Sequence, residues 1–232
     1  MSDAVRNRRI LYGRRQGHAL RAHHRGLMET LLPKIAATPE AARDPASLFG
    51  GMAKELWLEV GFGGGEHAAW QAAHRPDIGL IACEPFVNGV AKLLAQIEKD
   101  KLANVRIHGD DARDILDALP AASLSRVFVL FPDPWPKRRH WKRRFIGLDN
   151  LDRLARTMRI GAELRVASDI GEYVGWTLEH VMRDPRFRWT AEGPGDWRAR
   201  SADWPATRYE EKALKAGRKP AYLKFVRVTA SP

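Results

Sequence analysis

LWLEVGFGGGEHAAWQAAHRPDIGLIACEP, from Leu56 to Pro85, contains two strand-like runs and the segment that joins them. LWLEV is an apolar run that ends in a glycine-rich turn. GEHAAWQAAH then has the pattern of a helix, and GLIAC is a second apolar run. Continuous apolar runs of about five residues, separated by helical segments, are typical of a buried parallel sheet. The stretch therefore predicts one β–α–β unit of an α/β fold.

The same alternation continues along the chain. Further strand-like runs are VRIHG (105–109), RVFVLF (126–131) and ELRVAS (163–168), and helix-like segments follow them up to residue 184. After residue 186 come two more strand-like runs, RFRWTAEG and AYLKFVRV, joined by a charged loop that contains tryptophan. We predict a doubly wound, mostly parallel sheet of seven strands, whose ligands bind at the carboxyl ends of the strands.

The length of 232 residues suits one well-buried domain with some residues left for an arm. Residues 1–35 are predicted to form that arm, ending in a short helix at LMETLLPKI, and residues 36–232 the domain. The arm is basic, and we expect it to be mobile alone and ordered on an anion. Its arginines up to residue 26 are Arg6, Arg8, Arg9, Arg14, Arg15, Arg21 and Arg25.

The formal net charge is +11 and the isoelectric point is about 10.1, which favours a polyanionic partner. A basic surface that serves only solubility is the alternative. The lone cysteine, Cys83, excludes an internal disulfide framework and a cysteine-based zinc cluster. With no apolar leader, no run of membrane-spanning length and no heptad pattern, we expect a cytoplasmic monomer that does not bind a membrane.

The glycine turn carries Gly61, Gly63, Gly64 and Gly65, so its backbone can approach a ligand closely. It departs from the dinucleotide fingerprint, which needs glycine where Glu66 stands, and it lacks the Lys-Ser/Thr of a P-loop. Glu59 precedes the turn and disfavours a pyrophosphate. The turn therefore suits a ligand with a positive charge or an amino group.

Acidic residues follow the other predicted strands. Glu84 ends the second, Asp110 and Asp111 end the third, and Asp133 ends the fourth. Any one of them could simply cap a helix, but acids at four strand ends around a glycine turn indicate a ligand site. S-adenosylmethionine fits, because it has a sulfonium, an ammonium, a ribose diol and an adenine amine, and no phosphate. No metal requirement is indicated.

VFVLFPDPWPKRRHWKRR (127–144) places Asp133 among prolines and beside a basic run. Its cations suit the phosphates of a nucleic acid, and Trp135 and Trp141 suit an exposed base; a solvated helix start with packing tryptophans is the alternative. Farther on, DWRARSADWPATRYEEK interleaves aromatic and basic residues in the manner of an RNA-binding loop, or forms a surface loop held by two buried tryptophans. The cations of the first stretch are Lys137, Arg138, Arg139, Lys142, Arg143 and Arg144.

Six blocks together carry a family resemblance: LEVGFGGGEH, ACEP, GDDA, FPDPWPKRRHWKRR, ASD and TRYEEKALKAGRKPAYLKF. In order and spacing they resemble the bacterial tRNA (guanine-N7)-methyltransferases over roughly residues 5–228. The resemblance implies that the glycine turn (Gly61, Gly63) with Glu59, Glu84, Asp111 and Asp133 binds S-adenosylmethionine. It also implies that the substrate is bound by Lys137, Asp169, Thr207, Arg208, Tyr209 and Glu210. Arg208 and Tyr209 stand where Lys and Phe are common, which keeps the charge and the aromatic face.

The implied reaction is methyl transfer to N7 of the variable-loop guanine in tRNA. Guanine N7 has a lone pair and no proton, so no general base is needed, and catalysis rests on orientation. We expect Asp133 to orient the base and stabilise the positive charge that develops on it. Two alternatives stay open: a methyltransferase for another RNA or a small molecule, and an inactive tRNA-binding protein.

Overall fold

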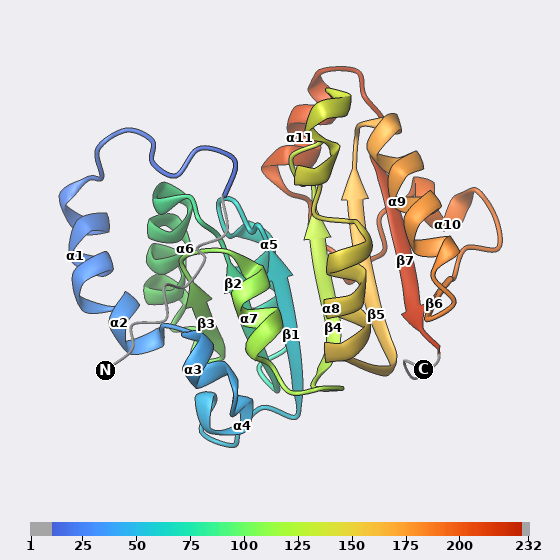
Figure 1. Cartoon of the computed structure of the whole chain (residues 1–232). Coiled ribbons are helices and arrows are strands. Elements are labelled where there is room, and N and C mark those ends of the chain that lie inside the picture. The colour runs from blue at the N-terminus through green and yellow to red at the C-terminus, as the bar shows by residue number, and fades with distance from the viewer. Residues whose placement is uncertain (1–10, 229–232) are drawn as a thin grey trace.

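The computed structural model describes residues 11–228, and within them the chain forms one seven-stranded sheet with helices on both faces (Figure 1). The strand order is β3-β2-β1-β4-β5-β7-β6. All neighbouring pairs from β3 to β5 are parallel, whereas β7 is antiparallel to both β5 and β6. The predicted doubly wound, mostly parallel fold is thus confirmed. The strands are β1 (Glu55–Val60), β2 (Ile78–Cys83), β3 (Val105–His108), β4 (Leu124–Leu130), β5 (Met158–Ser168), β6 (Phe187–Trp189) and β7 (Ala221–Arg227).

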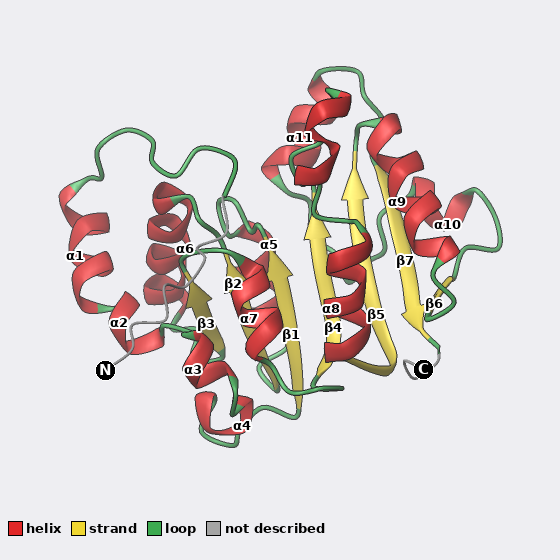
Figure 2. Ribbon diagram, viewed as in Figure 1, coloured by secondary structure: helices red, strands yellow, loops and turns green. Residues whose placement is uncertain are grey.

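Helices cover both faces of this sheet because its central strands are apolar on both sides (Figure 2). Leu56 and Leu58 of β1 belong to a core shared with α7, α8 and α9, whereas Trp57 belongs to the opposite core, shared with α1, α5 and α6. The helices are α1 (Ala22–Thr30), α2 (Leu32–Ile35), α3 (Pro39–Ala42), α4 (Pro45–Leu48), α5 (Glu66–His74), α6 (Val87–Asp100), α7 (Ala112–Ala118), α8 (Leu148–Thr157), α9 (Gly171–Arg183), α10 (Gly195–Arg198) and α11 (Arg208–Lys215), with a 3₁₀ helix η1 (Arg138–Arg143). Among residues 11–228, no helix is long and apolar enough to cross a membrane.

The strand order reverses between β1 and β4, which lie side by side at the centre of the sheet. In open α/β sheets such a reversal opens a crevice at the carboxyl ends of the two strands. The glycine turn follows β1 and the Asp133 loop follows β4. The topology therefore brings these two segments to the same place.

The segment between β6 and β7 differs from the predicted continuous loop, because it contains α10 and α11. Thr207 caps α11: its hydroxyl oxygen accepts a hydrogen bond from the Glu210 backbone N–H at 3.3 Å. Thr followed three residues later by Glu is a helix-start signal. The many charged and aromatic residues around it masked that signal in the sequence.

The described part of the arm contacts the domain. The carbonyl of Arg15 accepts a hydrogen bond from the Val87 N–H at 2.9 Å, and the Gly17 N–H donates to the Asn88 side chain at 2.7 Å. The arm then enters α1, which packs against α6 and begins five residues earlier than LMETLLPKI. Arg6, Arg8 and Arg9 lie outside the described residues.

Candidate methyltransferase site

The glycine turn is held open by left-handed backbone at Gly61 (φ 71°) and Gly63 (φ 58°), a conformation that favours glycine. The Glu84 carboxylate fixes the turn from the end of β2. It accepts hydrogen bonds from the Gly63 N–H at 2.7 Å and from the Phe86 N–H at 3.0 Å. Burial raises the pKa of Glu84, and these two bonds oppose that rise. Glu84 therefore organises the turn in addition to its predicted place at the strand end.

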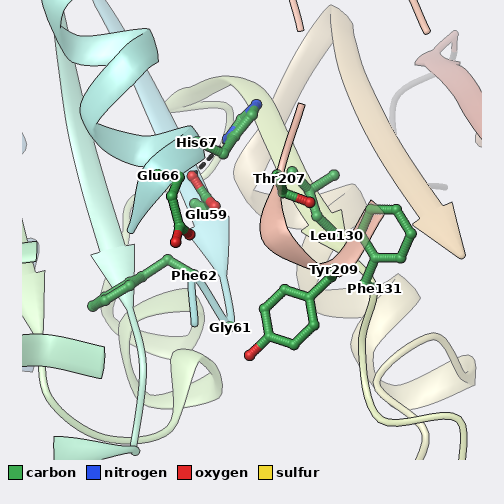
Figure 3. Close-up of a pocket in the computed structure, with 9 residues that line it drawn as sticks. All are labelled: Glu59, Gly61, Phe62, Glu66, His67, Leu130, Phe131, Thr207 and Tyr209. Atoms are coloured by element: carbon green, nitrogen blue, oxygen red, sulfur yellow. Dashed lines mark hydrogen bonds and ion pairs between the residues drawn. The ribbon is translucent and has the colours of Figure 1, made fainter. Parts of the chain in front are cut away.

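Glu59 is fully buried beneath the turn and pairs with a residue that the sequence reading missed. The His67 Nδ1 atom lies 2.8 Å from Glu59 Oε2, and both side chains are only 2% exposed (Figure 3). His67 Nε2 lies 3.1 Å from the Gln71 side-chain nitrogen, which donates to the Asp203 carbonyl at 2.9 Å. Buried polar groups need such partners. A histidine in the first turn of the helix after the glycines was the available signal.

At the end of β3, Asp111 is the N-cap of α7. Its carboxylate accepts from the Arg113 backbone N–H at 3.0 Å and from the Arg113 Nε–H at 2.8 Å. Asp110 pairs with Arg15 of the arm at 3.0 Å. The arm thus reaches this edge of the sheet.

The loop after β4 is strained around Asp133. Phe131 (φ 48°) and Trp135 (φ 42°) both adopt left-handed backbone, which bulky residues rarely do. Each such residue costs on the order of 1–3 kcal/mol and persists only where its surroundings enforce it. Asp133 is exposed on this loop, and partial desolvation of its carboxylate raises its pKa. The surroundings of the loop must therefore hold it in this conformation.

The Arg144 side chain holds the Asp133 loop in its conformation. Arg144 was predicted to bind phosphate, and this finding corrects that prediction. Its side chain is 1% exposed, donates to the carbonyls of Pro134 (2.9 Å) and Trp135 (3.3 Å), and pairs with Glu172 of α9 at 2.5 Å. The guanidinium also lies over the ring of Trp176. A buried cation with this many partners is structural. Arg144 is therefore unable to meet a phosphate.

The aromatic and basic residues of the loop divide into packed and exposed sets. Trp141 packs against Trp176, with 5.3 Å between ring centroids, so its packing alternative holds. Trp135 meets Tyr12 of the arm edge to face, and the Arg143 guanidinium lies 4.0 Å from the centre of the Tyr12 ring. The exposed cations, which form what we call the basic rim, are Lys137, Arg138, Arg139 and Lys142.

The first turn of α11 faces the glycine turn across the crevice (Figure 3). A Cβ atom on Gly63 would lie 2.7 Å from the Tyr209 ring, and Arg208 pairs with Glu66 of α5. Burial of the phenol raises the pKa of Tyr209. Glu210 is buried and accepts from the Arg200 Nε–H at 3.1 Å. Tyr209 lines a small pocket together with Glu59, Gly61, Phe62, Glu66, His67, Leu130, Phe131 and Thr207.

Two remaining residues have specific places at this edge. Asp169 follows β5 and pairs with Arg218 at 2.5 Å. Trp204 is 1% exposed and packs between His67 and Tyr222. At this position the alternative of a buried tryptophan that holds the loop is therefore correct, and stacking on a base is excluded. The structure thus gathers the glycine turn, the acids, the Asp133 loop and α11 at one edge of the sheet.

A sheet of this order, with a glycine turn after its first strand and acids at the strand ends, defines a class I methyltransferase. Solved structures share the fold: the 16S rRNA methyltransferase KamB has a TM-score of 0.54 at 13% identity, with 79% of this chain and 92% of that chain covered. A 16S rRNA (adenine(1408)-N(1))-methyltransferase from Catenulisporales acidiphilia has a TM-score of 0.53 at 15% identity, with 82% and 93% covered.

Relatives of higher identity define the family. A family described as "Putative methyltransferase" matches residues 53–223. The tRNA (guanine-N(7)-)-methyltransferase of Rhodospirillum rubrum is 55% identical over 93% of this chain and 87% of its own. That of Brucella anthropi is 48% identical over 97% and 98%. The chain belongs to the bacterial tRNA (guanine-N7)-methyltransferase family, and the resemblance drawn from the sequence is confirmed.

Proposed function

We infer that this protein is an enzyme that transfers the methyl group of S-adenosylmethionine to N7 of a guanine in tRNA. The observation that carries this inference is the meeting of the glycine turn and the strained Asp133 loop at the β1–β4 crevice, in a chain of this family. The finer proposal is that the target is the variable-loop guanine. The exposed cations beside the crevice support an RNA substrate.

The donor set fits S-adenosylmethionine, which when bound supplies a methyl group on a positively charged sulfur. Carboxylates stand at the ends of β1, β2 and β3, and the glycine turn carries no lysine or arginine that would favour a phosphate. We assign Glu59 and the backbone of Gly61 and Gly63 to the amino-acid end of the cofactor. Glu84 is assigned to the ribose and Asp111 to the adenine. Glu59 would act on the ammonium while His67 holds its carboxylate.

Asp133 is the proposed catalytic residue. Because guanine N7 carries no proton, Asp133 has no proton to remove, and its carboxylate instead orients the base and stabilises the cation that the product becomes. It can accept hydrogen bonds from the N1–H and N2–H₂ groups of guanine, which adenine does not present. Its position on a strained loop keeps this acceptor fixed.

The substrate is proposed to bind across the crevice. The basic rim, including Lys137, would neutralise phosphates, as the exposure of its four cations supports. The first turn of α11, Thr207 to Glu210, would close over the base from the other side, with the exposed Tyr209 ring as its aromatic face. Asp169 is assigned to the same substrate surface, where its ion pair with Arg218 orients it.

The direct test is methyl transfer from radiolabelled S-adenosylmethionine to an unmodified tRNA transcript, with the product mapped by cleavage at 7-methylguanine. We expect label at a single guanine of the variable loop. Label on a different RNA base would contradict the proposed target. If cofactor binds but no RNA is labelled, the chain is a small-molecule methyltransferase or an inactive tRNA-binding protein.

A further inference from the structure

A second hollow lies outside the crevice, between α10, α11 and the start of β7. We call it the side pocket, and it is lined by Trp197, Arg198, Leu214, Lys219 and Tyr222. Figure 1 shows α10 beside β7, and the two elements are in contact. β7 begins at Ala221, which pairs with Ser168, the residue just before Asp169. The side pocket therefore opens at the same edge of the sheet as the proposed substrate surface.

The walls of the side pocket combine aromatic and apolar groups with positive charge. Tyr222 is buried at its base, and Leu214 is 56% exposed. The Arg198 guanidinium lies 4.9 Å from the centre of the Trp197 ring. Within residues 11–228, no acidic group is paired with either Arg198 or Lys219, both of which are exposed. The one acid at the pocket, Glu210, is already paired with Arg200.

This chemistry matches a nucleotide. A base is a flat, largely apolar ring that stacks on aromatic side chains and arginine planes, and its phosphates attract exposed cations. An acidic peptide would use the cations but has no need of the aromatic wall. The nucleotide is favoured over the acidic peptide because the side pocket is continuous with the proposed substrate surface. Glu210 belongs both to the first turn of α11 and to the side pocket.

We propose that the side pocket binds an unpaired nucleotide of the tRNA that flanks the methylated guanine. This inference rests on the proposed function, since it takes tRNA as the substrate. Tyr209 faces the crevice and Leu214 faces the side pocket, five residues apart on α11, a rise of about 7.5 Å. That separation suits neighbouring nucleotides of one single strand. The pocket then adds affinity and register for the loop without touching the reacting atoms.

The test compares two double charge reversals in the full-length chain. The pocket variant is Arg198→Glu with Lys219→Glu, and the control is Lys99→Glu with Arg183→Glu, exposed residues near the carboxyl ends of α6 and α9. Both change the net charge equally, and all four positions are exposed. We measure tRNA affinity over a series of salt concentrations, and separately KM and kcat for methyl transfer.

The pocket variant is expected to raise the KM for tRNA about tenfold relative to the control, with kcat within about twofold. Its log–log slope of affinity against salt should be shallower by about 1.4, the value for two lost phosphate contacts on a single strand. Trp197→Leu should weaken affinity with the slope unchanged, because it removes an aromatic surface but no charge. Equal KM and slope in the pocket variant and the control would overturn the proposal.

The same data separate this inference from the proposed function. If the wild type methylates tRNA and the pocket variant behaves like the control, the proposed function stands and the nucleotide site in the side pocket is excluded. If the pocket variant binds tRNA more weakly than the control but the wild type transfers no methyl group, the side pocket stands as a tRNA-binding site and the proposed function is excluded.

Discussion

Asp133 is the residue on which the proposed chemistry rests. Its carboxylate stands on a loop bounded by two left-handed aromatic residues, at the end of one of the two strands that form the crevice. A reaction without proton removal needs a fixed acceptor for the base and a negative charge near the cation that forms. Asp133 offers both, so substitutions that separate hydrogen bonding from charge are informative.

Asp133→Asn keeps the size of the side chain and removes its charge. We expect kcat to fall by about 10²–10³, as for the loss of one preorganised electrostatic group, with tRNA affinity changed no more than about threefold. Single-turnover methyl transfer and a filter-binding titration measure the two effects. Turnover equal to that of the wild type would remove Asp133 from the mechanism.

The pKa of Asp133 gives an independent prediction. Desolvation penalises the ionised carboxylate, so the free protein should titrate this group above its ordinary value of 3.8. Since the ionised form is the active one, methyl transfer should rise as pH rises through that pKa. Carbon-13 NMR of the aspartate carboxyls, with Asp133→Asn to identify the signal, measures it. A value at or below 3.8 would contradict the desolvated environment.

At the level of single residues, the sequence showed which kinds of side chain lie at the site. It did not show that two adjacent residues of the same kind have different roles. The acids at the strand ends were found because their positions follow from the strand pattern. Arg143 and Arg144 look alike in KRR, yet one lies against Tyr12 and the other is buried against α9. His67 was missed because its partner, Glu59, is near it only once the glycine turn has folded. Tertiary contacts decide these cases, and the local sequence alone does not show which partner each side chain meets.

At the scale of elements, the glycine turn and the Asp133 loop shape the crevice. The glycine turn tolerates substitution less well. Gly63 combines left-handed backbone with the close approach of Tyr209 from α11. The turn is also tied to β2 through Glu84. A side chain at this position would therefore disturb the cofactor site and the α11 contact together.

Gly63→Ala should raise the Kd for S-adenosylmethionine at least tenfold. A left-handed alanine costs about 1–2 kcal/mol, and its Cβ would lie 2.7 Å from the Tyr209 ring. Gly175→Ala in α9 is the matched control, because no atom lies within 4 Å of the added Cβ and its φ is ordinary. Isothermal titration with the cofactor measures both variants. Equal affinities would show that the turn tolerates a side chain.

The Asp133 loop depends on Arg144, and Arg144→Lys tests this. Lysine keeps the charge but is unable to reach both carbonyls and Glu172, and a buried carbonyl left unpaired costs roughly 1–3 kcal/mol. We expect a lower unfolding temperature and a kcat reduced about tenfold or more, because misplaced catalytic groups lose rate. Arg183→Lys, on the exposed face of α9, is the control. A variant with lower stability but full kcat would make Arg144 purely structural.

At the scale of the whole molecule, the sheet was predictable because its strands are apolar on both sides and alternate with helices. The predicted helices between strands are all present, and the order of the strands places the glycine turn beside the Asp133 loop. The antiparallel β7, the helical segment 208–215 and the docking of residues 11–20 depend on long-range contacts. These features bring α11 and the arm to the same edge of the sheet as the glycine turn, an arrangement that the local sequence pattern does not contain.

In the proposed reaction, guanine N7 itself attacks the methyl group, and the protein supplies position and charge. The measurement that tests it most directly replaces the methylated guanosine of the tRNA by 7-deazaguanosine, which has a carbon at this position and keeps the pairing edge that Asp133 is proposed to read. We predict unchanged binding and no methyl transfer. Transfer at an undiminished rate would place the reaction at another atom and contradict the account.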